Sequence, residues 1–151
     1  MTAKANEELK RILGIDYGST RVGIALSDPL QIIAQPFTTL DYKRGIIEQI
    51  GEIVRNEGVG LIVVGMPLNL KGEKGKKAEE VEKFIQALAG SLTIDVLNWD
   101  ERFTTSIAHQ TLLDMGTKRG ERRTNKGRVD SMAAAILLQG FLDSRKRSLV
   151  C

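Results

Sequence analysis

Three carboxylates stand where strands or helices are expected to begin or end. Asp16 closes a short apolar run, Asp100 and Glu101 follow another, and Asp130 comes just before the apolar stretch of the last helix. Adjacent parallel strands end at the same edge of a sheet, and ligand sites form there. We therefore expect Asp16, Glu101 and Asp130 to converge at one edge.

Converging carboxylates repel one another unless a cation lies between them. The chain has one His, and its single Cys is the last residue, so oxygen ligands dominate and a Cys-rich zinc site is excluded. Hard oxygen ligands favour Mg²⁺ or Mn²⁺. Two such ions, about 3.5–4 Å apart, can activate a water and stabilise the leaving oxygen of a phosphodiester.

Each acid also has a simpler interpretation. Asp16 could cap the turn that follows it, Glu101 could pair with Arg102, and Asp130 could stabilise the first turn of its helix through the macrodipole. Asp130 stands beside an apolar stripe, where an unpaired buried charge would cost several kcal/mol. The three acids together are harder to explain in this way than each one alone.

Basic residues gather in three segments: 117–128 with six Lys/Arg, 71–77 with four Lys, and 145–147 with three Lys/Arg. Such segments are predicted to be surface loops or a tail, either as solvated loops or as contacts to a polyanion. For Arg21 and Arg102, a salt bridge and a phosphate contact both remain open. The candidate nucleic-acid-binding residues are Arg21, Asn69, Lys71, Lys74, Arg102, Lys118, Arg119, Arg122, Arg123, Lys126 and Arg128.

The composition is that of a soluble globular protein. The chain has 151 residues, is 42% hydrophobic and 27% charged, and carries a formal net charge of +3. This length predicts a single domain, with a core at about residues 10–142. No apolar run approaches the roughly 20 residues of a membrane helix, and the first residues do not resemble a signal peptide. We therefore expect a cytoplasmic protein that does not contact membranes.

Apolar periodicity predicts the elements that position these residues. Alternation or continuous apolar runs predict strands over 11–16, 21–27, 32–39, 61–64 and 92–99. Helical spacing predicts helices over 46–54, 81–88, 104–115 and 129–141, the first three ended by Gly58, Gly90 and Gly116. A hairpin followed by alternating units predicts an α/β protein, with a mixed sheet covered by helices on both faces.

Four segments in register resemble the YqgF (RuvX) family, relatives of the RuvC-type Holliday junction resolvases. The resemblance spans about residues 10–142. The matching motifs are Asp16-Tyr17-Gly18 with 21–25 and 27–28, 64–69 with Gly72 and Gly75, 100–105, and 129–134 with 138–139. Each motif alone would be weak, but the four together are specific.

The resemblance implies a ribonuclease H-like fold with a five-stranded mixed sheet whose first three strands are antiparallel. It implies that Asp16, Glu101 and Asp130 are the catalytic acids that bind Mg²⁺ or Mn²⁺. It also implies an endonuclease that matures the 5′ end of pre-16S rRNA. The chain departs from the family at Thr20, where Lys is common, and it offers no secure fourth acid.

Three alternatives remain open at this point. The substrate could be a four-way DNA junction, which a homodimer with paired sites would favour. The chain could be a non-catalytic RNA-binding factor that retains the acids. Residues 14–20 also resemble the phosphate loop of the actin, Hsp70 and sugar kinase superfamily, but those enzymes close two such domains around ATP, and this chain has room for one.

Overall fold

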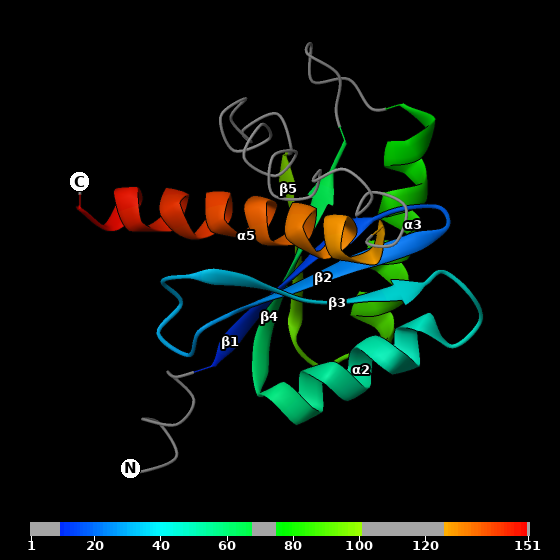
Figure 1. The fold of residues 1–151 in the computed structure, drawn as a ribbon, viewed down its shortest axis with the longest axis horizontal. Coiled ribbons are helices and arrows are strands. Elements are labelled where there is room, and N and C mark those ends of the chain that lie inside the picture. The colour runs from blue at the N-terminus through cyan, green and yellow to red at the C-terminus, as the bar shows by residue number, and fades with distance from the viewer. Residues whose placement is uncertain (1–9, 68–74, 101–125, 151) are drawn as a thin grey trace.

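The fold is an open sheet with helices packed against it, seen in a computed structural model that describes residues 10–67, 75–100 and 126–150 (Figure 1). The elements, in chain order, are β1 (Arg11–Tyr17), β2 (Arg21–Ser27), β3 (Ala34–Asp41), α2 (Ile46–Glu57), β4 (Val59–Met66), α3 (Lys76–Ser91), β5 (Asp95–Asp100) and α5 (Lys126–Val150). The predicted helix over 104–115 lies outside the described residues.

The five strands lie in the order β3-β2-β1-β4-β5. β1 pairs antiparallel with β2, and β2 pairs antiparallel with β3. β4 runs parallel to both β1 and β5. This topology confirms the predicted mixed sheet with an antiparallel first half, and it places the ends of β1, β4 and β5 at one edge.

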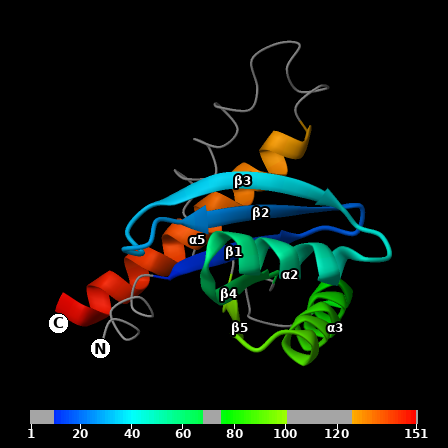
Figure 2. The same cartoon turned by 90° about the horizontal axis from the view of Figure 1, so that it is seen from below.

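Two apolar clusters cover the two faces of the sheet. On one face, Leu13, Ile15 and Ile24 pack with side chains of α2 and α3. On the other, Ile12, Ala25 and Val63 pack with α5. Figure 2 shows the sheet between these layers, with α5 on the side opposite α2 and α3. Strand alternation explains the division, because successive side chains point to opposite faces.

Glycines explain one predicted helix end and not another. Gly58 follows α2 in the left-handed region (φ 67°, ψ 49°), and its N–H donates to the Val54 carbonyl oxygen, as a glycine C-cap does. Gly90 was expected to end α3, but this helix continues through it to Ser91. A helix tolerates an interior glycine at a cost of about 1 kcal/mol relative to alanine.

The third strand begins two residues later than predicted, at Ala34, because residues 28–33 form a hydrogen-bonded loop. The Asp28 carboxylate accepts from the N–H groups of Ile32 (2.7 Å) and Ile33 (2.8 Å). The side chain of Gln139 on α5 accepts from the Ala34 N–H at 2.8 Å and donates to the Ile32 carbonyl at 3.0 Å. The loop is thereby tied to α5.

The last helix is longer than its apolar stripe predicts. α5 begins at Lys126, inside the basic segment predicted to be a loop, and it includes the 145–147 cluster, which was predicted to lie in a loop or tail. A run of charged residues does not end a helix whose central part is anchored by apolar packing against the sheet. The fifth strand also differs, since β5 begins at Asp95 rather than Leu92.

In the part of the chain that the structure describes, no helix is long and apolar enough to cross a membrane.

Candidate active site

The α5 face of the sheet carries Asp16. A Cβ added to Gly14 would lie 2.8 Å from the Leu138 Cβ of α5, so the side-chain direction at Gly14 is toward that helix. Asp16 is two residues further along β1 and therefore points to the same face. It pairs with Gly23 of β2 in the antiparallel ladder, and paired residues share a face. The Asp16 side chain is therefore on the side of the sheet that α5 covers.

α5 meets the sheet most closely at Gly23. A Cβ on this glycine would overlap the backbone carbonyl oxygen of Asp130. The Asp130 backbone therefore lies directly over the residue paired with Asp16, about one strand spacing (~4.8 Å) from β1. Figure 1 shows the beginning of α5 near the end of the β1–β2 hairpin. Of the three predicted acids, the structure brings Asp16 and Asp130 to one place.

A short ion pair ties the second of these acids to β2. The Arg21 Nε donates to Asp130 Oδ2 at 2.6 Å, and these side chains are 35% and 26% exposed. Arg21 precedes Gly23 by two residues, so it lies on the same face of β2. Of the two roles predicted for Arg21, the structure contains the salt bridge.

The macrodipole does not explain Asp130. α5 begins at Lys126 and has no acidic residue in its first turn, so Asp130 lies in the second turn. The helix dipole acts mainly within the first turn. The carboxylate is placed by the contact between helix and strand and is neutralised by Arg21.

The third predicted acid, Glu101, lies outside the described residues. The described chain ends β5 at Asp100, at the same edge of the sheet as Asp16. Within residues 10–67, 75–100 and 126–150, no three His, Cys, Asp or Glu side chains gather closely enough to hold an ion. Asp16 and Asp130, whose backbones lie on adjacent elements here, have the hard oxygen chemistry that Mg²⁺ and Mn²⁺ prefer, so the described residues fit part of such a site.

Most of the predicted phosphate-binding residues are not described. Those that lie outside the described residues are Asn69, Lys71, Lys74, Arg102, Lys118, Arg119, Arg122 and Arg123. Lys126 and Arg128 lie in the first turn of α5, the helix that carries Asp130. Basic positions therefore stand within one turn of an acid in the candidate site.

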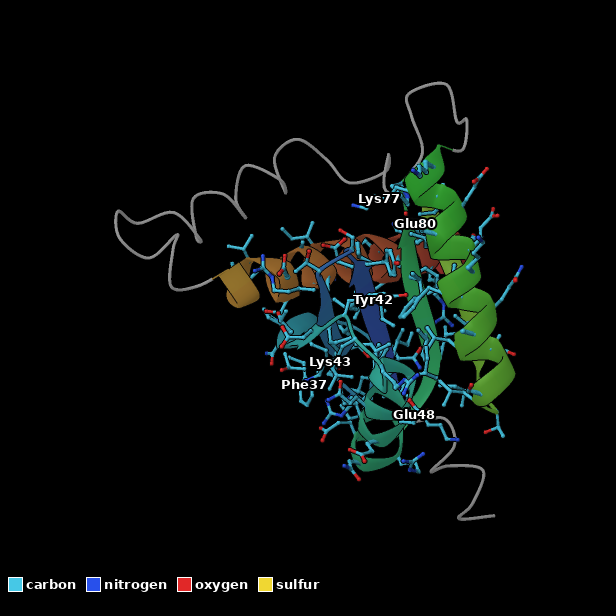
Figure 3. The ribbon with its side chains drawn as sticks, turned by 90° about the vertical axis from the view of Figure 1, so that its right-hand side faces the viewer. Phe37, Tyr42, Lys43, Glu48, Lys77 and Glu80 are labelled. Atoms are coloured by element: carbon cyan, nitrogen blue, oxygen red, sulfur yellow. The ribbon has the colours of Figure 1, made fainter. Side chains whose placement is uncertain are left out.

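An aromatic cluster on the other face anchors the strand end that carries Asp16. The Tyr17 ring packs edge-on against Tyr42, with centroids 5.3 Å apart, and against Phe84, with centroids 5.0 Å apart. Burial raises the pKa of Tyr17, and a hydrogen bond with Tyr42 and the nearby Glu80 charge raise it further. In Figure 3, Tyr42 lies below Glu80 of α3. The residue that follows Asp16 is therefore buried and packed on the face of the sheet opposite α5.

Sequence analysis did not single out Gly23 as a site residue. The sequence nevertheless indicated a special role for Gly23, because a glycine inside a strand with apolar alternation often marks the close approach of another backbone. Trp99 of β5 packs against the α5-side apolar cluster, edge-on to Phe141.

Comparisons with known proteins identify the family to which the chain is similar. The sequence profile of the RuvX family, described as Holliday junction resolvase, matches residues 10–144. A protein of Acetivibrio thermocellus named "Putative pre-16S rRNA nuclease" is 40% identical over 143 residues, covering 92% of this chain and 99% of that protein. A protein of the same name from Pelotomaculum thermopropionicum is 43% identical over 140 residues, covering 91% and 89%.

Two solved structures share the fold. RuvC of T. thermophilus, in complex with a Holliday junction substrate, has a TM-score of 0.56 at 13% identity and covers 91% of this chain and 96% of its own. The Fowlpox virus resolvase, in complex with Holliday junction DNA, has a TM-score of 0.50 at 13% identity, covering 93% and 99%. These likenesses confirm the predicted ribonuclease H-like fold, and the profile and the close relatives show that the chain belongs to the RuvX family of nucleases and resolvases.

Proposed function

We propose that this chain is a metal-dependent endonuclease that hydrolyses phosphodiester bonds of structured RNA. The observation that carries the proposal is the approach of the Asp130 backbone to Gly23, the residue paired with Asp16. Two carboxylates that lie close together repel each other, and a cation bound between them removes this repulsion. The names of the relatives favour pre-16S rRNA as substrate. We propose that the chain acts at the 5′ end of this RNA, and hence in ribosome biogenesis in the cytoplasm.

In this proposal, Asp16, Glu101 and Asp130 hold Mg²⁺ or Mn²⁺. When bound, these cations supply Lewis-acid stabilisation of the charge that develops on the phosphate. Water adds to phosphorus, the bond to the leaving oxygen breaks, and the leaving oxygen takes up a proton. The carboxylates would hold the cations, and the packing of Tyr17 keeps the Asp16 backbone in place.

Basic residues balance the repulsion between these acids and an RNA backbone. Lys126 and Arg128 precede Asp130 by one turn or less, and Lys71, Lys74 and the cations of 118–123 extend the positive charge in the sequence. Lys and Arg contacts to phosphates supply sequence-independent affinity that falls as salt rises. These contacts carry no base identity, so the substrate is selected by shape.

The test compares precursor 16S rRNA with a four-way DNA junction, incubated side by side with Mn²⁺. The variant is Asp16→Asn, which keeps the side-chain shape and removes the charge. Asp95→Asn is the matched control, because Asp95 is an exposed acid at the start of β5, at the opposite edge of the sheet. We expect the wild type and the control to cleave RNA, and the Asp16 variant to lose about 10³-fold or more in rate.

Three outcomes would change the proposal. Equal cleavage by the wild type and Asp16→Asn would remove the carboxylate from the reaction. Cleavage of the junction but not the RNA would reassign the substrate, and a dimer in sedimentation would support that, because paired sites suit a two-fold junction. RNA binding without cleavage, with circular dichroism unchanged, would indicate a non-catalytic RNA-binding factor.

A further inference from the structure

The ion pair between Arg21 and Asp130 occupies the candidate metal site itself. It joins β2 to α5 across 109 residues of sequence, and the Arg21 Nε lies 2.6 Å from Asp130 Oδ2. The same Asp130 backbone covers Gly23, which pairs with Asp16. A guanidinium is therefore bound to one of the oxygens that the proposed function assigns to a divalent cation.

Stability alone gives little reason for this pair. Both side chains are partly exposed, and ion pairs in such positions contribute little to the free energy of unfolding. Two converging carboxylates, by contrast, need a positive charge close by. In the described structure, Arg21 supplies a positive charge of this kind to Asp130.

Simultaneous binding of a guanidinium and a divalent cation to the Asp130 carboxylate is energetically unfavourable. The second lone pair of Oδ2 and the other carboxylate oxygen remain available as acceptors, but two positive centres a few ångströms apart repel strongly where solvent is partly excluded. Arg21 has room to move, since its side chain is 35% exposed. Once released at this edge, its planar fork matches the geometry of a phosphate.

We propose that Arg21 is a displaceable counter-ion: it binds Asp130 in the metal-free protein and leaves when a divalent cation binds. Arg21 is thus a positioning residue that lowers metal affinity and keeps the empty site assembled. This inference rests on the proposed function, because it requires Asp16 and Asp130 to be metal ligands. It predicts that removing the guanidinium strengthens metal binding, whereas a purely structural arginine would have the opposite effect.

The test is calorimetric titration of the full chain with Mn²⁺, without nucleic acid. Arg21→Ala is expected to bind Mn²⁺ about fivefold more tightly than the wild type, because no ion pair has to be displaced. Arg21→Lys keeps the charge and is expected to stay within about threefold of the wild type. Arg11→Ala is the matched control, because Arg11 donates to the Ser27 carbonyl at 3.0 Å at the far end of the hairpin, and its affinity should not change.

Thermal unfolding supplies a second readout. In EDTA, Arg21→Ala is expected to melt below the wild type, because its carboxylates lose their counter-ion. Saturating Mn²⁺ should narrow or reverse this difference, since a ligand bound more tightly by the folded state stabilises it more. A structural role would leave the same deficit with and without Mn²⁺.

The outcomes separate the inference from the proposed function. If Mn²⁺ binds the wild type and not Asp16→Asn, but binds Arg21→Ala with unchanged or weaker affinity, the counter-ion role is wrong and the metal site stands. If Mn²⁺ does not bind the wild type in any Asp16-dependent way, both the counter-ion role and the metal-dependent function are overturned.

Discussion

Gly23 is the residue on which the assembly of the candidate site depends most directly. An alanine Cβ at this position would overlap the backbone carbonyl oxygen of Asp130 and come within 3.0 Å of the Ser131 nitrogen. Backbone atoms inside a helix cannot rotate away as a flexible side chain can. Gly23→Ala therefore requires α5 to lift from β2, and the Asp130 carboxylate would move with it.

The size of the effect follows from the kind of clash. Overpacking a core costs typically 1–3 kcal/mol, and a clash with helix backbone belongs at the upper end, so we expect about 3 kcal/mol. For a chain of this length, that corresponds to a fall in Tm of about 6–12 °C. α5 packs on β1, β2 and β3 through a buried apolar face, which is why the protein should still fold.

Urea denaturation followed by circular dichroism measures this free energy, and Gly90→Ala is the matched control. Gly90 lies inside α3, and an added Cβ there meets nothing within 4 Å. Alanine at that position should raise stability by about 0.5–1 kcal/mol. If Gly23→Ala were as stable as the wild type while Gly90→Ala showed its expected gain, α5 would not be seated on Gly23, and the convergence of Asp16 with Asp130 would lose its basis.

Two pH profiles test the charged groups that support the fold. The Ile33 N–H, which donates to the Asp28 carboxylate, holds the pKa of that carboxyl below its usual value. The stabilisation from the Asp28 carboxylate is fully present above pH ~4 and is lost as the pH falls further. The Tm of Asp28→Asn should therefore fall less at acid pH than the Tm of the wild type. An equal fall would contradict this. Burial raises the pKa of Tyr17, so its contribution is full below pH ~10 and is lost at higher pH. Tyr17→Phe should lose less stability than the wild type between neutral pH and pH 11, and parallel profiles would show that Tyr17 is not responsible.

The sequence contained enough to predict the sheet and to single out Asp16 and Asp130 as candidate site residues. Alternation in β1 and β2 and the continuous apolar run of β4 are local signals, and each survives in the structure. The placement of Asp16 at a strand end followed from the same pattern. Asp130 could be connected with it because a carboxylate beside an apolar stripe must have a reason to be there.

Other features depend on partners that are remote in sequence. The Arg21–Asp130 pair spans 109 residues, and Gln139 of α5 fixes the start of β3 at a separation of 105 residues. Local sequence patterns do not identify such long-range partners. The length of α5 was underestimated for a related reason, because a helix that is anchored by packing continues through charged residues that an apolar stripe does not include.

The candidate site is assembled from the first strand and the last helix of the fold. Ligand binding at this site is therefore coupled to the docking of α5 on the sheet. Asp16 belongs to the first strand and Asp130 to the last helix, and they meet only when α5 docks on β2 at Gly23. Any group that binds both acids therefore stabilises the docked helix by the same free energy with which docking strengthens that binding. The Arg21–Asp130 ion pair also stabilises the docked position of α5, because it joins this helix to β2. The apolar face of α5 holds the helix on the sheet, and the ion pair places a positive charge beside Asp130 before a cation or a substrate arrives.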